Sequence, residues 1–263
     1  MLGKLIKHEL NDRVKNLSVF YILSIVFAIL TRIFFKIENS LIFSIVASIC
    51  SGITISMMVN IIINNILRFW VRFRQTMYGD ESYLTHTLPC KKSVIYASKI
   101  LCALFTMLIS VTVIVLSVFV AYYSKENIEI FKVILDSIGT ALNVPVSTMV
   151  FVLALVLFLQ YSCLLQNGFT GIILGHKMQG GKIGFSFLFG FIAYSIVQMG
   201  SLLIIFIVAL FDKNIMEMFT SNTITSTEGI RTVFIIVSIA YALFMAIGYI
   251  VNVKLLKKGV NVE

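Results

Sequence analysis

The amino-acid sequence predicts an all-α polytopic membrane protein with six transmembrane helices, an N-terminal amphipathic interfacial helix and a short cytoplasmic helix. Of its 263 residues, 59% are hydrophobic and 13% are charged, and the mean hydropathy is +0.99. A soluble domain of this size does not need so much apolar surface. The only prolines are Pro89 and Pro145, so we expect unbroken helical spans. The alternating segments of about ten residues that build a membrane β-barrel are absent.

The chain opens with an amphipathic stretch at residues 2–17. Apolar residues recur there at helical spacing, with basic residues opposite them. Glu9 and Arg13 stand four residues apart and could pair along the edge of this helix. Basic amphipathic segments of this kind lie in the membrane interface. We therefore expect an interfacial helix at 2–17. The alternative is a short start to the first span with no role of its own.

Six long apolar stretches follow, and each approaches or exceeds the roughly 20 residues that cross a bilayer core. They cover about 17–35, 41–67, 99–123, 146–175, 183–211 and 232–253. The fourth is longer than needed, so it should tilt, kink or project into the cytoplasm, and the fifth is again long. Residues 126–142 have an apolar side and a charged side, which predicts a further interfacial helix.

Polar amides interrupt two of the spans. The second contains Asn60 and Asn64, and the fourth contains Gln160, Gln166 and Asn167. Such amides usually form hydrogen bonds to neighbouring helices. The other interpretation is that they line a substrate pathway.

The residues that would carry catalysis are missing. No span contains Asp or Glu, and the three histidines form no H-E-x-x-H motif. The four cysteines show no C-x-x-C spacing. Residues 176–182 partly resemble a phosphate-binding loop, but His176 replaces its first glycine and Ile183 its Ser/Thr. We expect no catalytic residue, no metal site and no nucleotide or other cofactor in this chain.

The longest polar insertion, residues 68–98, separates the second and third spans. Arginines lead into it and lysines lead out of it. Gly79 and Asp80 are loop and cap residues, and Pro89 stops a helix. This pattern predicts one short helix at 81–88 with Tyr83, Leu84 and Leu88 as its apolar residues. Such a helix could dock into another protein or lie on lipid headgroups.

Charge distribution predicts the topology. With six spans, most of the 21 basic residues fall at the two termini, in 68–98 and in 176–182. Most of the 12 acidic residues fall on the other side. Because basic loops face the cytoplasm, we expect both termini there. The same distribution explains the net charge of +9 without nucleic acid as a partner.

The insertion resembles the first cytoplasmic loop of permease subunits of type-2 ATP-binding-cassette (ABC) exporters from Gram-positive bacteria. The matching residues are the lead-in Arg72/Arg74, then Asp80-Glu81, Tyr83-Leu84-Thr85, Thr87-Leu88-Pro89 and Ser98-Lys99. The opening MLGKLIKHEL is also similar to the start of such permeases. The six-span pattern fits the family over almost the whole chain, and the resemblance implies that the outer part of the fifth span, residues 201–211, could be re-entrant.

The resemblance implies that 68–98 is a coupling loop whose helix transmits motion from a separate ATPase. The implied coupling residues are Asp80, Glu81, Tyr83, Leu84, Thr85, Leu88 and Pro89. Glu9, Arg72 and Arg74 are implied as further contacts to the ATPase or at an interface. The implied partners are two copies of a cytosolic ATPase, which bind ATP and Mg²⁺, and a second permease chain in a homodimer or heterodimer.

In this interpretation the protein lies in the bacterial cytoplasmic membrane. Members of the family export amphipathic or hydrophobic compounds such as peptides, antimicrobials and lipids, and hydrolysis occurs in the partner rather than in the permease. The sequence leaves open one alternative from another class: a non-transporting membrane scaffold or sensor that binds a cytoplasmic partner.

Overall fold

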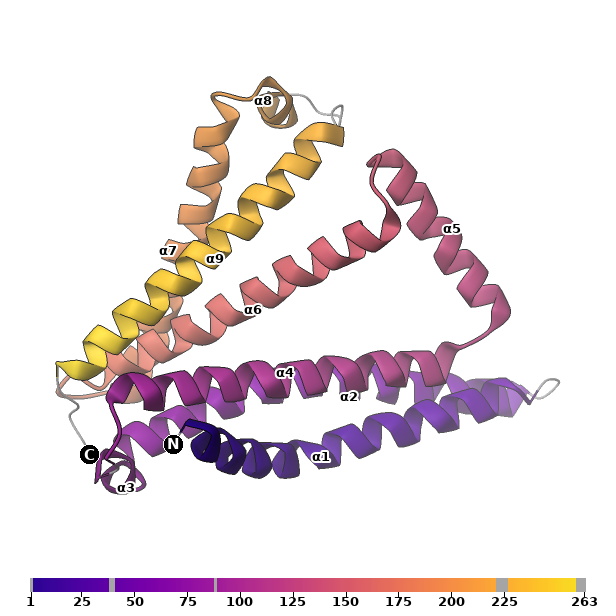
Figure 1. Ribbon diagram of the computed structural model, residues 1–263. Coiled ribbons are helices and arrows are strands. Elements are labelled where there is room, and N and C mark those ends of the chain that lie inside the picture. Colours follow the sequence, from indigo (N-terminus) through magenta and orange to yellow (C-terminus); the bar gives the residue numbers. More distant parts are fainter. Residues whose placement is uncertain (1, 38–40, 88, 221–226, 259–263) are drawn as a thin grey trace. The chain divides into compact units, whose positions relative to one another are not determined.

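The computed structural model describes residues 2–37, 41–87, 89–220 and 227–258. Within these ranges every regular element is an α-helix (Figure 1). Among the described residues, six helices are long and apolar enough to cross a membrane, which confirms an all-α polytopic membrane protein. They are α1 (Leu2–Phe35), α2 (Leu41–Tyr78), α4 (Lys92–Tyr122), α6 (Val146–Gly175), α7 (Lys182–Ala209) and α9 (Thr227–Lys257).

The described residues also form three shorter helices, and the sequence predicts the first two of them. They are α3 (Ser82–Thr87), α5 (Lys125–Ala141) and α8 (Lys213–Thr220). The chain divides into two compact units. The first consists of Met1–Gln75 and Leu84–Glu129, and the second of Thr76–Tyr83 and Ile130–Glu263.

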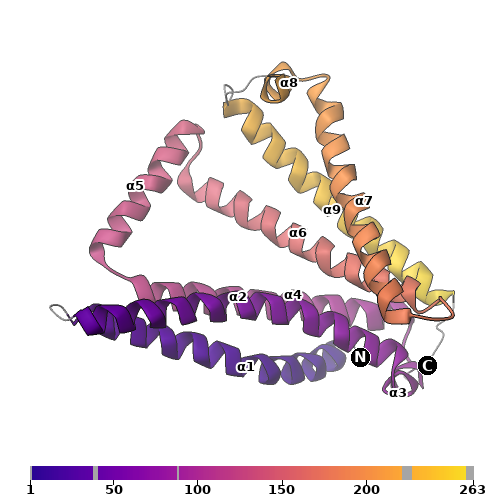
Figure 2. The ribbon, with the colours of Figure 1, turned by 180° about the vertical axis from the view of Figure 1, so that it is seen from behind.

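In the first unit, α1, α2 and α4 run alongside one another, as both views show (Figures 1 and 2). Small and hydroxyl-bearing side chains join them. Ser24 donates a 2.9 Å hydrogen bond to Ser117, and Tyr21 and Ser110 share one of 2.8 Å. Asn65 donates from α2 to the same Ser110 hydroxyl at 2.8 Å. Small residues let helices approach closely inside a membrane, so these contacts set the packing of the three spans.

In the second unit, α6 and α7 pack through glycine. A Cβ atom added to Gly171 would lie 2.5 Å from the Cα of Gly190, and one added to Gly175 would lie 2.6 Å from the Cα of Ser186. Gly171 and Gly175 form a small-xxx-small pair on α6, and Ser186 and Gly190 form its counterpart on α7. The α9 helix joins α6 through Asn252, which accepts a hydrogen bond from Thr170 at 2.8 Å.

The N-terminal segment differs from the expectation. Residues 2–17 are helical, but they continue without a break into the first span as a single helix, α1. No glycine or proline lies between residues 4 and 35 to interrupt the backbone hydrogen bonds. The structure therefore has one long helix where the sequence predicted an interfacial helix followed by a span.

The predicted coupling loop is also much shorter than expected. The second span was predicted to end at residue 67, but α2 continues to Tyr78, and α4 begins at Lys92. Arg68, Arg72 and Arg74 are thus residues of a helix, not of a loop. The fifth span runs unbroken from Lys182 to Ala209, so the segment that could have been re-entrant continues the same helix.

Candidate functional site

The short helix α3 is the centre of the candidate site. The carbonyl of Gly79 accepts a 2.8 Å hydrogen bond from the backbone N–H of Ser82. This turn ends α2 and starts α3. The Thr87 hydroxyl donates to the Leu84 carbonyl at 3.0 Å and closes the last turn. The helix is therefore one residue shorter at its start than the predicted 81–88, and Leu88 lies outside the described residues.

Two apolar side chains of α3 face outward. Tyr83 is 66% exposed and Leu84 is 73% exposed. Asp80 and Pro89 at the two ends are exposed as well, whereas Glu81 and Thr85 are half-buried. Ser82, by contrast, is fully buried. The helix thus holds its backbone start inside the protein and presents an apolar pair on its surface.

An aromatic contact anchors the end of α2, just before α3. The ring of Tyr78 stacks on the ring of His176, with centroids 4.2 Å apart, and both residues are buried. The backbone N–H of His176 donates to the Ile172 carbonyl at 3.1 Å, which places this residue at the end of α6. In the sequence, His176 is notable only as the residue that replaces the first glycine of a phosphate-binding loop. Its spacing in the sequence gives no sign of a contact nearly a hundred residues away.

A second aromatic contact anchors the start of α4, just after α3. The rings of Phe73 and Tyr96 meet edge to face with centroids 6.3 Å apart, and both side chains are buried. Aromatic pairs in this arrangement add to the energy of burial. The segment 79–91 is therefore tied down at both of its ends.

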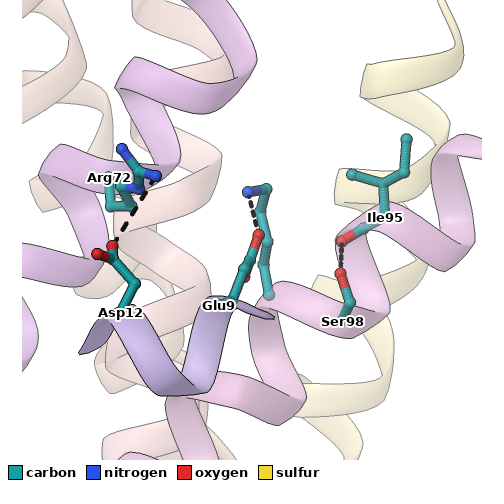
Figure 3. A network of polar contacts seen from close by, with 6 residues as sticks. Glu9, Asp12, Arg72, Ile95 and Ser98 are labelled. Atoms are coloured by element: carbon teal, nitrogen blue, oxygen red, sulfur yellow. Dashed lines mark hydrogen bonds and ion pairs between the residues drawn. The ribbon is translucent and has the colours of Figure 1, made fainter. Parts of the chain in front are cut away.

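A charged cluster lies in the first unit, where α1 meets α2 and α4. Lys99 on α4 is only 3% exposed, and its ammonium donates a 2.8 Å hydrogen bond to a carboxylate oxygen of Glu9. Figure 3 shows Glu9 and Asp12 on α1, with Asp12 reaching toward Arg72. The carboxylate of Asp12 and the guanidinium of Arg72 are 3.9 Å apart. Two of the three implied interface residues, Glu9 and Arg72, therefore have these partners within the chain, and the third, Arg74, also makes a contact within it.

Arg13 contacts an aromatic ring instead of the partner expected for it. The sequence suggested an ion pair between Glu9 and Arg13, but the carboxylate of Glu9 contacts Lys99. The guanidinium carbon of Arg13 lies 4.1 Å from the centre of the Phe69 ring. Two residues four apart on an isolated helix can pair, but here α4 supplies Lys99 as a closer partner for Glu9.

Asn60 and Asn64, which the sequence offers as pathway residues, form hydrogen bonds within their own helix. Asn60 donates to the Ser56 carbonyl at 3.0 Å, and Asn64 donates to the Asn60 carbonyl at 2.9 Å. Both side chains are half-buried. They satisfy their own helix, whereas their neighbour Asn65 joins α2 to α4.

The amides of the fourth span have different surroundings. Gln166 and Asn167 are buried, and Gln160 is half-buried. The backbone carbonyl of Gln166 accepts a 3.3 Å hydrogen bond from Asn252 on α9. This part of α6 is thus a helix contact within the second unit.

The described residues contain no group of three His, Cys, Asp or Glu side chains that could hold a metal ion. No protein-family model, curated protein or solved structure matches the chain. The described residues establish a membrane protein with six helices long and apolar enough to span, and the adjacent apolar pair Tyr83 and Leu84 is exposed on α3.

Proposed function

We propose that this chain is the permease subunit of a type-2 ABC exporter that moves amphipathic or hydrophobic substrates out of the cell, driven by a separate ATPase. The observation that carries the proposal is the exposed pair Tyr83 and Leu84 on an anchored short helix. Their match to the family's coupling loop supports it.

The physical case begins with the cost of exposure. Burial of large apolar side chains by a partner lowers the free energy of the system. Aromatic or aliphatic anchors in pockets supply most of the binding energy of an interface. Two aromatic contacts flank α3, Tyr78 on His176 and Phe73 on Tyr96. Through them, a displacement of α3 would be transmitted to the spans. A coupling element needs both properties, an exposed docking face and a fixed base.

The proposed location is the bacterial cytoplasmic membrane with both termini in the cytoplasm. Charge asymmetry supports this orientation. In the proposed orientation, α3 would lie on the side where ATP is available. The proposed partners are two copies of an ATPase that binds ATP and Mg²⁺ and a second permease chain. The most apolar stretches of α7 and α9 are only 6% and 11% buried, which leaves wide surfaces for lipid and for that second chain.

Leu84→Asp tests the proposal. Truncating a buried anchor costs on the order of 2 kcal/mol or more, which corresponds to roughly thirtyfold in affinity. Leu84→Asp should therefore release the co-purifying ATPase, or end the stimulation of its turnover by substrate, while the chain still inserts into the membrane. Asp80→Asn, at the rim, should have a milder effect that decreases with added salt.

Met178→Asp is the matched control, because Met178 is also exposed and apolar and lies outside α3. It should leave assembly and turnover intact. Unchanged ATPase binding and turnover in Leu84→Asp would refute docking through α3. An ATPase that binds the wild-type chain, but never responds to a substrate, would favour the scaffold or sensor alternative.

A further inference from the structure

A cleft opens between α1 and α2 within the first unit, and it does not involve α3. It has a volume of about 350 Å³. Its lining includes Asp12, Arg13, Asn16, Arg68, Phe69 and Arg72. In the sequence these residues directly precede the apolar run that begins at 17 and directly follow the one that ends at 67. The cleft therefore lies at the level where both spans leave the hydrocarbon core.

The charges of the cleft do not balance. Three arginines and a single aspartate line it, so its lining carries a formal excess of positive charge. The neighbouring ion pair of Glu9 and Lys99 is itself neutral and does not reduce this excess. Near a membrane core, an excess of one sign of charge is costly, so an anion in the cleft would stabilise this arrangement.

Two buried groups point to a ligand. Arg13 is 6% exposed, and among the described residues no carboxylate lies within ion-pair distance of it. Asn65 is 2% exposed and also lines the cleft. Its amide nitrogen is bonded to Ser110, but its amide oxygen has no hydrogen-bond partner in the described structure. A buried oxygen of this kind normally has a donor. A ligand with both a phosphate and a hydroxyl group would satisfy both residues.

Arg68 supplies donors at the mouth of the cleft. It uses one N–H for the Asn16 carbonyl at 3.0 Å. A guanidinium has five N–H donors in a fixed fork, and this fork matches the oxygens of a phosphate. Arg68 can thus hold the backbone of α1 and still bind an anion.

The apolar surroundings favour a lipid as the source of the phosphate. Leu17 and Val71 also line the cleft, and Val71 is 54% exposed. An acyl chain could lie along such a surface while its headgroup enters the cleft. Basic pockets between spans on the cytoplasmic side are suited to anionic headgroups.

We propose that the cleft between α1 and α2 binds the phosphate of an anionic phospholipid with a hydroxylated headgroup, of the phosphatidylglycerol type. The phosphate lies among Arg13, Arg68 and Arg72, and a headgroup hydroxyl donates to the oxygen of Asn65. This site is independent of the proposed ATPase partner.

The test measures lipid binding to the full-length chain. Native mass spectrometry would count phosphatidylglycerol and phosphatidylcholine molecules bound to the wild type, and thermal melting would be followed in bilayers of each lipid. The wild type should prefer phosphatidylglycerol, and Arg68→Gln/Arg72→Gln should reduce that preference at least about tenfold, since charge-assisted hydrogen bonds are lost. The control is Arg231→Gln, which changes an exposed arginine at the start of α9 and should keep the preference.

Each result decides the matter. Equal binding of the two lipids, or a preference that survives in the double variant, would overturn the proposal. Inorganic phosphate that stabilises the chain in phosphatidylcholine bilayers as much as phosphatidylglycerol does would overturn the assignment to a lipid. If the double variant does not fold, the lipid preference is measured in Arg68→Gln alone, which should fold because Arg68 is partly exposed.

Discussion

Replacing Lys99 with methionine should strongly destabilise the protein, even though the new side chain is apolar and of similar length. Lys99 is 3% exposed, and its ammonium lies 2.8 Å from the carboxylate of Glu9. The other oxygen of that carboxylate is buried and has no hydrogen-bond partner in the described structure. Lys99→Met would therefore leave a largely buried carboxylate without its cation, a change that costs about 3–5 kcal/mol.

The double variant Glu9→Gln/Lys99→Met separates the charge effect from packing. It removes both charges, and replacing a buried pair by neutral groups is often close to neutral. We expect it to recover most of the stability lost in Lys99→Met. The coupling energy from the double-mutant cycle should then exceed about 1 kcal/mol, as for contacting residues in general.

The pair of Asp12 and Arg72 is the matched control. Its charged atoms are 3.9 Å apart, and its side chains are 46% and 29% exposed. Exposed pairs contribute about 0–1 kcal/mol, so Asp12→Asn should change stability little. The assay is unfolding of the full chain in detergent micelles or nanodiscs. If Lys99→Met costs no more than Asp12→Asn, or the double variant is no better than Lys99→Met, then Glu9 and Lys99 are not coupled as the structure indicates.

Gly171→Leu should destabilise the contact of α6 with α7 by about 1–3 kcal/mol, because a Cβ there would lie 2.5 Å from the Cα of Gly190. Gly184→Leu, at a position where nothing lies within 4 Å of an added Cβ, should be tolerated, and equal melting temperatures for the two variants would contradict this packing. Cysteines placed at the exposed positions Gln179 and Lys213 test the orientation with a membrane-impermeant thiol reagent applied to intact cells. Position 213 should be labelled and position 179 protected, and the reverse pattern would overturn the proposed topology.

Sequence patterns predicted the elements of this protein well because those elements depend on local properties. The apolar runs identify the six spans by length and hydropathy alone. Gly79 and Pro89 bracket α3, which spans Ser82–Thr87 against an expected 81–88. The alternation of apolar and charged faces likewise located α5.

Helix ends were predicted less well, because membrane burial and helix formation obey different rules. The sequence predicts that the second span ends at residue 67, where the arginines begin, but α2 continues to Tyr78. Arginine is a good helix former, and a helix that leaves the membrane keeps its backbone hydrogen bonds. Residues 2–17 joined α1 for the same reason. The polar segment between the second and third spans is consequently shorter than the sequence predicts, and it surrounds α3.

The residues that support the candidate site depend on contacts between distant parts of the chain. Glu9 had a partner within reach on its own helix in Arg13, yet tertiary packing brought it to Lys99. Hydropathy and spacing describe one segment at a time, so they give the pair of Tyr78 and His176 no signal at all. Only the packing of the helices decides which buried charge meets which counter-charge, because that choice depends on distance and burial in three dimensions.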